Sequence, residues 1–165
     1  MIKAFFLDRD GVLIKNYHYN VDSNKIKWLK GAIEAIKILN KRKIKVIVVT
    51  NQSGIARGLF KEKNLHTFHR NMKKLLLKKN AKIDKFYFCP FHPKGVIKKY
   101  KKKSNLRKPG NGMLRIALRQ FKLKPNTCFM IGDKKTGYLA AKKTKILFQY
   151  KKQCSLDKQI KSIIY

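Results

Sequence analysis

Three short apolar runs, each ended abruptly by polar residues, constrain the fold of this chain more than any other feature. The runs, with the polar residue that follows, are 2–7 before Asp8, 44–49 before Thr50, and 128–131 before Gly132 and Asp133. A run of four to eight apolar, often β-branched residues is typical of a strand that is buried on both faces. Such strands occur mainly in parallel sheets that helices cover on both sides.

Segments with helical periodicity lie between these runs. Apolar residues recur at three- or four-residue spacing, which predicts helices at 31–41, 61–78, 113–121, 138–143 and 156–164. Two further short strands are expected at 86–88 and 145–148. The alternation predicts an α/β protein, a three-layer sandwich around a mainly parallel, Rossmann-like sheet with right-handed crossovers. With 165 residues the chain suits a single domain over 1–165, interrupted by a proline- and glycine-rich loop at 89–112.

The charge balance is strongly basic, with 42 lysines and arginines against 8 acidic residues and a net charge of +34. Such an excess attracts phosphate groups and could mark a nucleic-acid or membrane-surface binder. However, only 7 of the 42 are arginines, and the forked arginine side chain is the favoured donor to phosphates and bases. Lysine, asparagine and isoleucine have AT-rich codons, so a biased genome also explains the charge. We therefore expect no nucleic-acid partner. The alternative is that the positive electrostatic field of the basic residues attracts an anionic ligand.

Two classes of protein are excluded by the remaining composition. No apolar run approaches the roughly 20 residues of a membrane span, and residues 1–4 lead directly into a strand instead of a signal peptide. The three cysteines, Cys89, Cys128 and Cys154, are widely spaced and odd in number, which argues against a disulfide framework. We expect a cytoplasmic protein that makes no membrane contact and is a monomer.

Polar side chains follow three of the predicted parallel strands. Asp8 and Asp10 follow the first, Thr50 and Asn51 the second, and Asp133 the third. Because ligands of open α/β sheets bind at the carboxyl ends of the strands, we expect these residues to meet in one crevice. Three carboxylates are hard oxygen donors that suit Mg²⁺.

Two lysines extend this predicted site. Lys108 follows the long loop and Lys134 follows Asp133, so both could hold an anion beside the cation. A threonine hydroxyl, an ammonium group and a divalent cation are the parts that phosphoryl transfer requires.

Four sequence blocks carry a family resemblance. They are FLDRDGV at 6–12, VTNQSGIARG at 49–58, RKP at 107–109 and IGDK at 131–134. In order and spacing they resemble the haloacid dehalogenase superfamily, and within it the small phosphatases without a large cap domain. The resemblance implies a Mg²⁺-dependent phosphomonoesterase acting on a small phosphorylated sugar, first of all on the 7-phosphate of D-glycero-D-manno-heptose 1,7-bisphosphate in lipopolysaccharide-precursor synthesis. Histidinol phosphate, another small phosphomonoester or a polynucleotide end is the alternative substrate.

The same resemblance implies a role for each motif residue. Asp8 is the nucleophile that forms an aspartyl-phosphate, and Asp10 is the general acid and base. The transferring phosphoryl group is held by Thr50, Arg107 and Lys108. The Mg²⁺ ligands are Asp8, the main-chain carbonyl of Asp10, and Asp133. The expected substrate-binding residues are Asn16, Tyr19, Thr50, Asn51, Gln52, Ser53, Arg107, Lys108 and Lys134.

Two departures from the family pattern bear on the cofactor. Members often carry a zinc-binding loop, Cys-x-His followed by Cys-x-Cys, of which this chain keeps only Cys89 and His92, with Ser104 and Leu106 at the later positions. Two ligands cannot build a four-coordinate zinc site, so we expect no zinc. The acidic residue usual shortly after the third aspartate is replaced by Gly137, which we expect to weaken Mg²⁺ binding without abolishing it.

Overall fold

A single five-stranded sheet organises the molecule. The computed structural model describes all residues from 1 to 165. The strands are β1 (Ala4–Leu7), β2 (Lys45–Asn51), β3 (Lys85–Cys89), β4 (Cys128–Gly132) and β5 (Leu147–Tyr150). They lie in the order β3-β2-β1-β4-β5, and every neighbouring pair is parallel. All five carboxyl ends therefore lie at one edge of the sheet.

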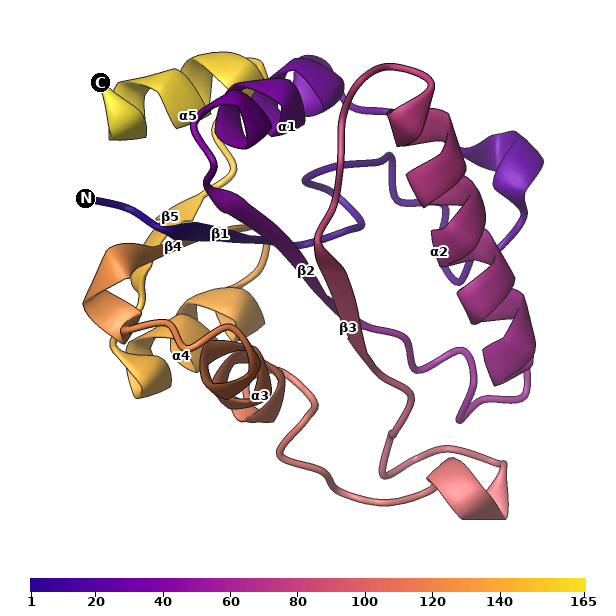
Figure 1. Ribbon diagram of the computed structural model, residues 1–165. Coiled ribbons are helices and arrows are strands. Elements are labelled where there is room, and N and C mark those ends of the chain that lie inside the picture. Colours follow the sequence, from indigo (N-terminus) through magenta and orange to yellow (C-terminus); the bar gives the residue numbers. More distant parts are fainter.

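Helices cover both faces of this sheet. They are α1 (Ala32–Lys41), α2 (Glu62–Leu77), α3 (Gly112–Gln120), α4 (Lys135–Thr144) and α5 (Leu156–Ile164), with short 3-10 turns at Ser23–Lys25, Lys98–Tyr100 and Pro125–Thr127. Helices α1, α2 and α5 lie on one face, and α3 and α4 lie on the other (Figure 1). The predicted three-layer α/β class is confirmed, and the sheet is parallel throughout.

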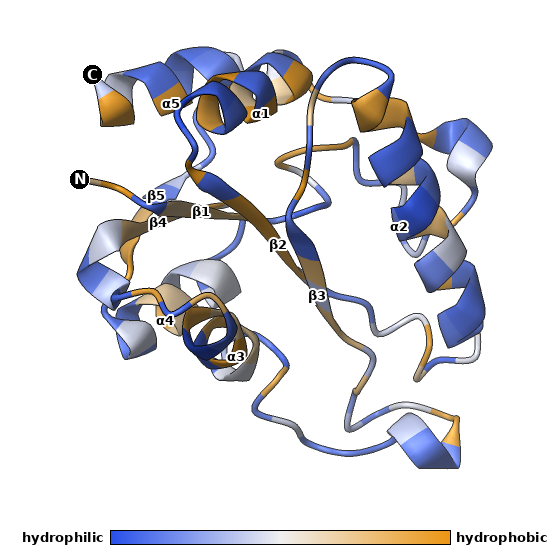
Figure 2. Ribbon diagram, in the orientation of Figure 1, coloured by the Kyte–Doolittle hydropathy of each residue, from blue (hydrophilic) through white to orange (hydrophobic).

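The central strand β1 shows why these residues form a two-sided core. Phe5 and Leu7 face the layer of α1, α2 and α5, whereas Ala4 and Phe6 face the layer of α3 and α4. All four residues are fully buried, and the strands stand out as hydrophobic between helices with hydrophilic outer faces (Figure 2). Burial of each large apolar side chain contributes about 1.5–3 kcal/mol.

Several element boundaries differ from the predicted ones. Strand β2 extends to Asn51, since Thr50 and Asn51 continue the pairing with β3. Helix α4 starts at Lys135 instead of 138. Its first turn is polar, so the apolar periodicity of the sequence does not reveal that turn. Strand β5 starts two residues later than predicted, because Lys145 adopts the left-handed conformation that ends α4.

The chain leaves β2 and β3 at this edge in two loops that are joined to each other. The main-chain N–H groups of Val96 and Ile97 donate to the carbonyl of Ala56, at 2.8 and 3.0 Å. The Tyr100 hydroxyl donates to a carboxylate oxygen of Glu62 at 2.7 Å. The long loop thus packs against the segment that follows β2. None of the helices combines the length and the apolarity that crossing a membrane requires.

Candidate active site

A cavity of about 260 Å³ opens at the carboxyl edge of the sheet. Its lining residues are Asp8, Asp10, Asn16, His18, Tyr19, Thr50, Asn51, Gln52, Ser53, Arg107, Lys108, Asp133, Lys134 and Thr136. All twelve residues proposed from the sequence are among these fourteen. His18 lies between the expected substrate-binding residues Asn16 and Tyr19. Thr136 lies in the first turn of α4, close to Asp133, and no sequence pattern distinguishes it.

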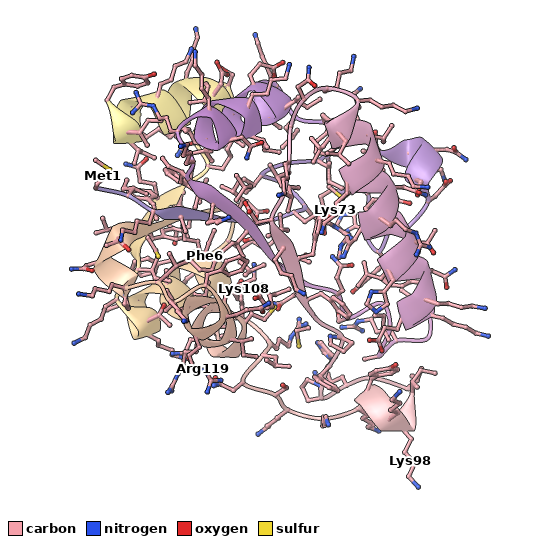
Figure 3. The ribbon with its side chains drawn as sticks, viewed as in Figure 1. Met1, Phe6, Lys73, Lys98, Lys108 and Arg119 are labelled. Atoms are coloured by element: carbon pink, nitrogen blue, oxygen red, sulfur yellow. The ribbon has the colours of Figure 1, made fainter.

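At the bottom of the cavity Asp8 forms an ion pair with Lys108. The Lys108 ammonium donates to a carboxylate oxygen of Asp8 and, at 3.0 Å, to the carbonyl of Val49. Both residues are buried, with 7% and 4% of their surface exposed. Lys108 lies inside the molecule, whereas Lys98 projects from the outer end of the long loop (Figure 3). Opposite charges at this depth compensate each other's lost hydration.

The charge state of Asp8 depends on opposing effects. Burial raises the pKa of its carboxyl above the ordinary value, and the negative charges of Asp133 and Asp10 raise it further, while the Lys108 ammonium lowers it. A divalent cation in the same place would favour the ionised carboxylate, because its charge offsets both the burial and the repulsion.

Lys108 is held in position by the side chain of Asn51. The Asn51 amide nitrogen donates to the main-chain carbonyl of Lys108, and its amide oxygen accepts from the Lys108 N–H, both at 3.0 Å. Asn51, which is expected to bind substrate, lines the cavity. Both of its polar atoms are engaged with Lys108, which lies 57 residues away in the sequence.

A second network holds the side chain of Asp10. The Arg9 guanidinium donates to the Asp10 carboxylate at 3.0–3.2 Å, and the Gln52 amide donates both to Asp10 at 3.1 Å and to the Thr50 hydroxyl at 2.9 Å. The Asp10 carboxylate is thus engaged by Arg9 and Gln52, and the Mg²⁺ ligand that the family resemblance implies at this residue is its main-chain carbonyl. No three acidic, histidine or cysteine side chains gather as a metal site.

Arg9 is itself enclosed, with 1% of its surface exposed. It lies 4.8 Å from the centre of the Phe68 ring and contacts the ring Nε2 of His69 at 3.3 Å. Burial, assisted by the charge of Arg9, lowers the pKa of His69 to about 2, so the ring is neutral and accepts from Arg9. No sequence pattern singles out Arg9 for this role.

The residues that could hold Mg²⁺ are Asp8, Asp133 and main-chain oxygens. The Asp133 carboxylate lies against Gly11, where a Cβ would come within 2.5 Å of its Oδ2, and a Cβ on Gly132 would come within 3.0 Å of Asp8 Oδ2. Asp133 also raises the pKa of Asp8, after burial and against the effect of Lys108. Two repelling carboxylates in a polar cavity are a donor set that suits Mg²⁺ with retained waters.

The residues at the positions of the family's zinc ligands contact other parts of the protein. The buried Cys89 thiol contacts the carbonyl of Phe91 at 3.9 Å, and burial raises its pKa. The His92 ring contacts Arg57, and the Ser104 hydroxyl accepts from the N–H of Leu106. Hydrogen bonds of these kinds hold the loop in place.

Known proteins are similar to this chain over most of its length. The family model described as polynucleotide kinase 3 phosphatase matches residues 2–156. The chain is 39% identical over 139 residues to the D-glycero-beta-D-manno-heptose-1,7-bisphosphate 7-phosphatase of Rhodopseudomonas palustris, covering 84% of this chain and 77% of the relative. It is 40% identical to the Haemophilus influenzae protein of the same name, covering 81% and 72%.

A solved structure has the same fold over the whole chain. The crystal structure of D,D-heptose 1,7-bisphosphate phosphatase from B. bronchiseptica, complexed with magnesium and phosphate, superposes with a TM-score of 0.80. The match covers 99% of this chain and 98% of the other at 24% identity. At that identity the likeness establishes the fold.

Proposed function

This chain belongs to the haloacid dehalogenase-like phosphatases related to D-glycero-beta-D-manno-heptose-1,7-bisphosphate 7-phosphatase, and from that premise we propose that it removes the 7-phosphate of D-glycero-D-manno-heptose 1,7-bisphosphate in a Mg²⁺-dependent reaction. The observation that carries the proposal is the buried Asp8–Lys108 pair at the bottom of a cavity that Asp10, Thr50 and Asp133 also line. A carboxylate nucleophile, an ammonium group, a hydroxyl and a second carboxyl are the parts needed for transfer through an aspartyl-phosphate.

The proposed reaction uses Asp8 and Asp10 in two half-reactions. A carboxylate oxygen of Asp8 attacks phosphorus, and the bond from phosphorus to the sugar oxygen breaks as the Asp10 carboxyl gives that oxygen its proton. The Asp10 carboxylate then takes a proton from water, the water oxygen attacks phosphorus, and the bond to Asp8 breaks to release phosphate. The Asp10 side chain is 26% exposed, so both the leaving oxygen and water can reach it.

In the proposed reaction Lys108 and Thr50 bind the transferring phosphoryl group. Lys108 balances Asp8 in the substrate-free protein, and its one remaining N–H group is available to a phosphoryl oxygen. Gln52 donates to the Thr50 hydroxyl, which leaves the hydroxyl proton free to donate to the same oxygens. Asp8, Asp133 and the Asp10 main-chain carbonyl would hold Mg²⁺, whose charge would offset that of the transferring group.

The shape and polarity of the cavity agree with a small, charged substrate. Only one of its 14 lining residues is hydrophobic, and a volume of about 260 Å³ is at the small end for a ligand site. The test is phosphate release from the heptose bisphosphate, histidinol phosphate and a 3′-phosphorylated oligonucleotide, each with Mg²⁺ and with EDTA. The proposal requires the highest kcat/KM for the heptose ester and loss of activity in EDTA; a clear preference for another ester would refute the substrate.

A polynucleotide 3′-phosphatase is the second candidate, favoured by the description of the matching family model and by the net charge of +34. Tyr19 is the one aromatic residue, apart from histidine, in the cavity lining, whereas single-stranded nucleic acids are usually held on several stacking aromatics. This candidate predicts turnover of the oligonucleotide with an affinity that falls steeply as salt rises.

A further inference from the structure

The Arg9 guanidinium is a buried cation that donates to Asp10 from behind the cavity. Arg9 is 1% exposed and is not among the residues that line the cavity. Its Nε and Nη2 atoms form a fork on the Asp10 carboxylate, at 3.0–3.2 Å. A substrate can therefore meet the Asp10 side chain, which is 26% exposed, without contacting the group that holds it.

The two oxygens of the Asp10 carboxylate are held unequally. Oδ2 accepts from Arg9 Nη2 at 3.0 Å and from Gln52 Nε2 at 3.1 Å, and Arg9 Nε lies 3.2 Å away. Oδ1 accepts from Arg9 Nε alone, at 3.1 Å. Each carboxylate oxygen has two lone pairs, so the two shorter bonds occupy those of Oδ2, whereas Oδ1 keeps one lone pair free. A proton on the Asp10 side chain is therefore carried by Oδ1.

His69 on α2 holds the other end of the Arg9 guanidinium. Arg9 Nη1 lies 3.3 Å from Nε2 of the His69 ring, and because arginine can only donate, Nε2 is the acceptor. Burial and the charge of Arg9 lower the pKa of the ring to about 2, so the acceptor lone pair is present at neutral pH. The Phe68 ring, with its centre 4.8 Å from the guanidinium, adds a cation–π contact.

The His69 ring is itself fixed between α2 and β3. It stacks on Phe86 of β3, with the ring centres 4.2 Å apart and the planes at 16°. Lys73, one turn further along α2, extends towards the same strand (Figure 3), and its ammonium lies 5.8 Å from the Phe86 ring centre. The cavity lining contains no residue of α2 or β3, so these two elements support Asp10 through Arg9.

Holding the Asp10 carboxyl matters for proton transfer. The terminal torsion of an aspartate is broad and roughly two-fold, so an unsupported carboxyl rotates and exchanges its two oxygens. A general acid must lie within hydrogen-bond reach of the atom that it protonates, and a misplacement of about 1 Å can reduce a rate by about a hundredfold. The Arg9 fork and the Gln52 amide oppose this rotation.

We propose that Arg9, supported by His69, is a positioning residue that fixes the Asp10 carboxyl with Oδ1 directed to the leaving oxygen of the ester and then to the attacking water. This inference rests on the proposed function, because it takes Asp10 as the general acid and base. Neither Arg9 nor His69 contacts substrate. Both act on the steps in which Asp10 Oδ1 gives its proton to the sugar oxygen and later takes one from water.

The test compares an ester whose leaving group needs a proton with one whose leaving group does not. A sugar oxygen must be protonated as it departs, whereas p-nitrophenolate departs as an anion. The quantity compared is kcat/KM, which reports formation of the aspartyl-phosphate and not its hydrolysis. Arg9→Met should lower kcat/KM for the heptose bisphosphate by about tenfold to a hundredfold. For p-nitrophenyl phosphate the change should not exceed about threefold.

Two substitutions of His69 test the same unit from its other end, and they decide the question if Arg9→Met does not fold. His69→Phe keeps the stacking on Phe86 but removes the acceptor, and should lower kcat/KM for the heptose ester by about twofold to tenfold. His69→Gln retains an acceptor oxygen and should restore most of this loss. His66→Phe is the matched control on the same helix: the His66 side chain is 58% exposed, and both esters should react as with the wild type.

Equal losses on both esters in Arg9→Met and His69→Phe would overturn the positioning role, because a merely structural defect does not depend on the leaving group. Asp10→Asn is the reference that separates this inference from the proposed function, and should lose about 10²–10⁴-fold on the heptose ester with little loss on p-nitrophenyl phosphate. If only Asp10→Asn shows this dependence, the inference alone is refuted. If Asp10→Asn lacks it, the acid role of Asp10 fails and the inference fails with it.

Glycerol 2-phosphate, a second ester with an alcohol leaving group, separates the inference from the choice of substrate. If the wild type hydrolyses it but not the heptose ester, the heptose substrate is refuted. The dependence on leaving group in Arg9→Met, measured with glycerol 2-phosphate and p-nitrophenyl phosphate, then supports or overturns the positioning role by the same criterion.

Discussion

Replacing Asn51 by alanine tests whether this side chain positions Lys108 or binds substrate. The change removes two hydrogen bonds of 3.0 Å between the Asn51 amide and the main chain of Lys108. Each is worth about 0.5–1.5 kcal/mol net, so the free energy of unfolding should fall by about 1–3 kcal/mol. The upper part of this range is favoured because Lys108 is buried and its N–H would lose its partner.

Two assays measure the effect of Asn51→Ala. Urea denaturation should show the lower stability, and a loss of about 2 kcal/mol should reduce Tm by about 4–8 °C for a chain of this size. In steady-state kinetics kcat should fall by a similar factor for every phosphate ester, with little change in KM, because the Lys108 ammonium is no longer fixed beside Asp8. Asn24→Ala is the control: Asn24 is exposed and its side chain makes no hydrogen bond, so its effect should stay within about 0.5 kcal/mol.

The opposite pattern would refute a positioning role for Asn51. A side chain that contacts substrate directly would raise KM when it is removed and would leave the free energy of unfolding unchanged. Unchanged stability together with a raised KM would therefore return Asn51 to the substrate-binding role expected from the motif alone.

Three further predictions follow from the same geometry. Gly11→Ala should destabilise the protein by about 1 kcal/mol or more and raise the Mg²⁺ concentration for half-maximal activity, because Gly11 has a φ of 81° and a Cβ would come within 2.5 Å of Asp133 Oδ2; an unchanged Mg²⁺ titration would contradict this. Asp8→Asn should abolish phosphate release with an unchanged far-UV circular dichroism spectrum, and residual full turnover would exclude Asp8 as nucleophile. His69 stays neutral in the folded protein with a pKa of about 2, so below about pH 6.5 the unfolded chain binds one more proton than the folded protein. The free energy of unfolding should therefore decrease as the pH is lowered from about 6.5, by up to about 1.4 kcal/mol per pH unit. In urea denaturation at several pH values His69→Gln should remove this slope, and an equal slope in the variant would contradict the prediction.

The strands, the helices and the edge at which the candidate site lies are readable in the sequence. Burial of a strand or of one helix face imposes a local periodicity on the chain, which is why α5 starts and ends where its apolar pattern predicts. The parallel arrangement then requires Asp8, Thr50 and Asp133 to share one edge, since consecutive strands joined by helices run in the same direction. The four motif blocks add the chemistry that this edge carries.

Only the tertiary structure decides which polar groups become partners across that edge. Asn51 holds the main chain of Lys108, the Asp10 carboxylate accepts from Arg9 and Gln52, and the Arg57 guanidinium lies 5.9 Å from the ring centre of Tyr19. No periodicity encodes these contacts, because a hydrogen bond is directional and short and depends on how separate loops approach one another in space. The sequence spacing predicts where the site is, and the packing of the loops determines which atoms each side chain contacts.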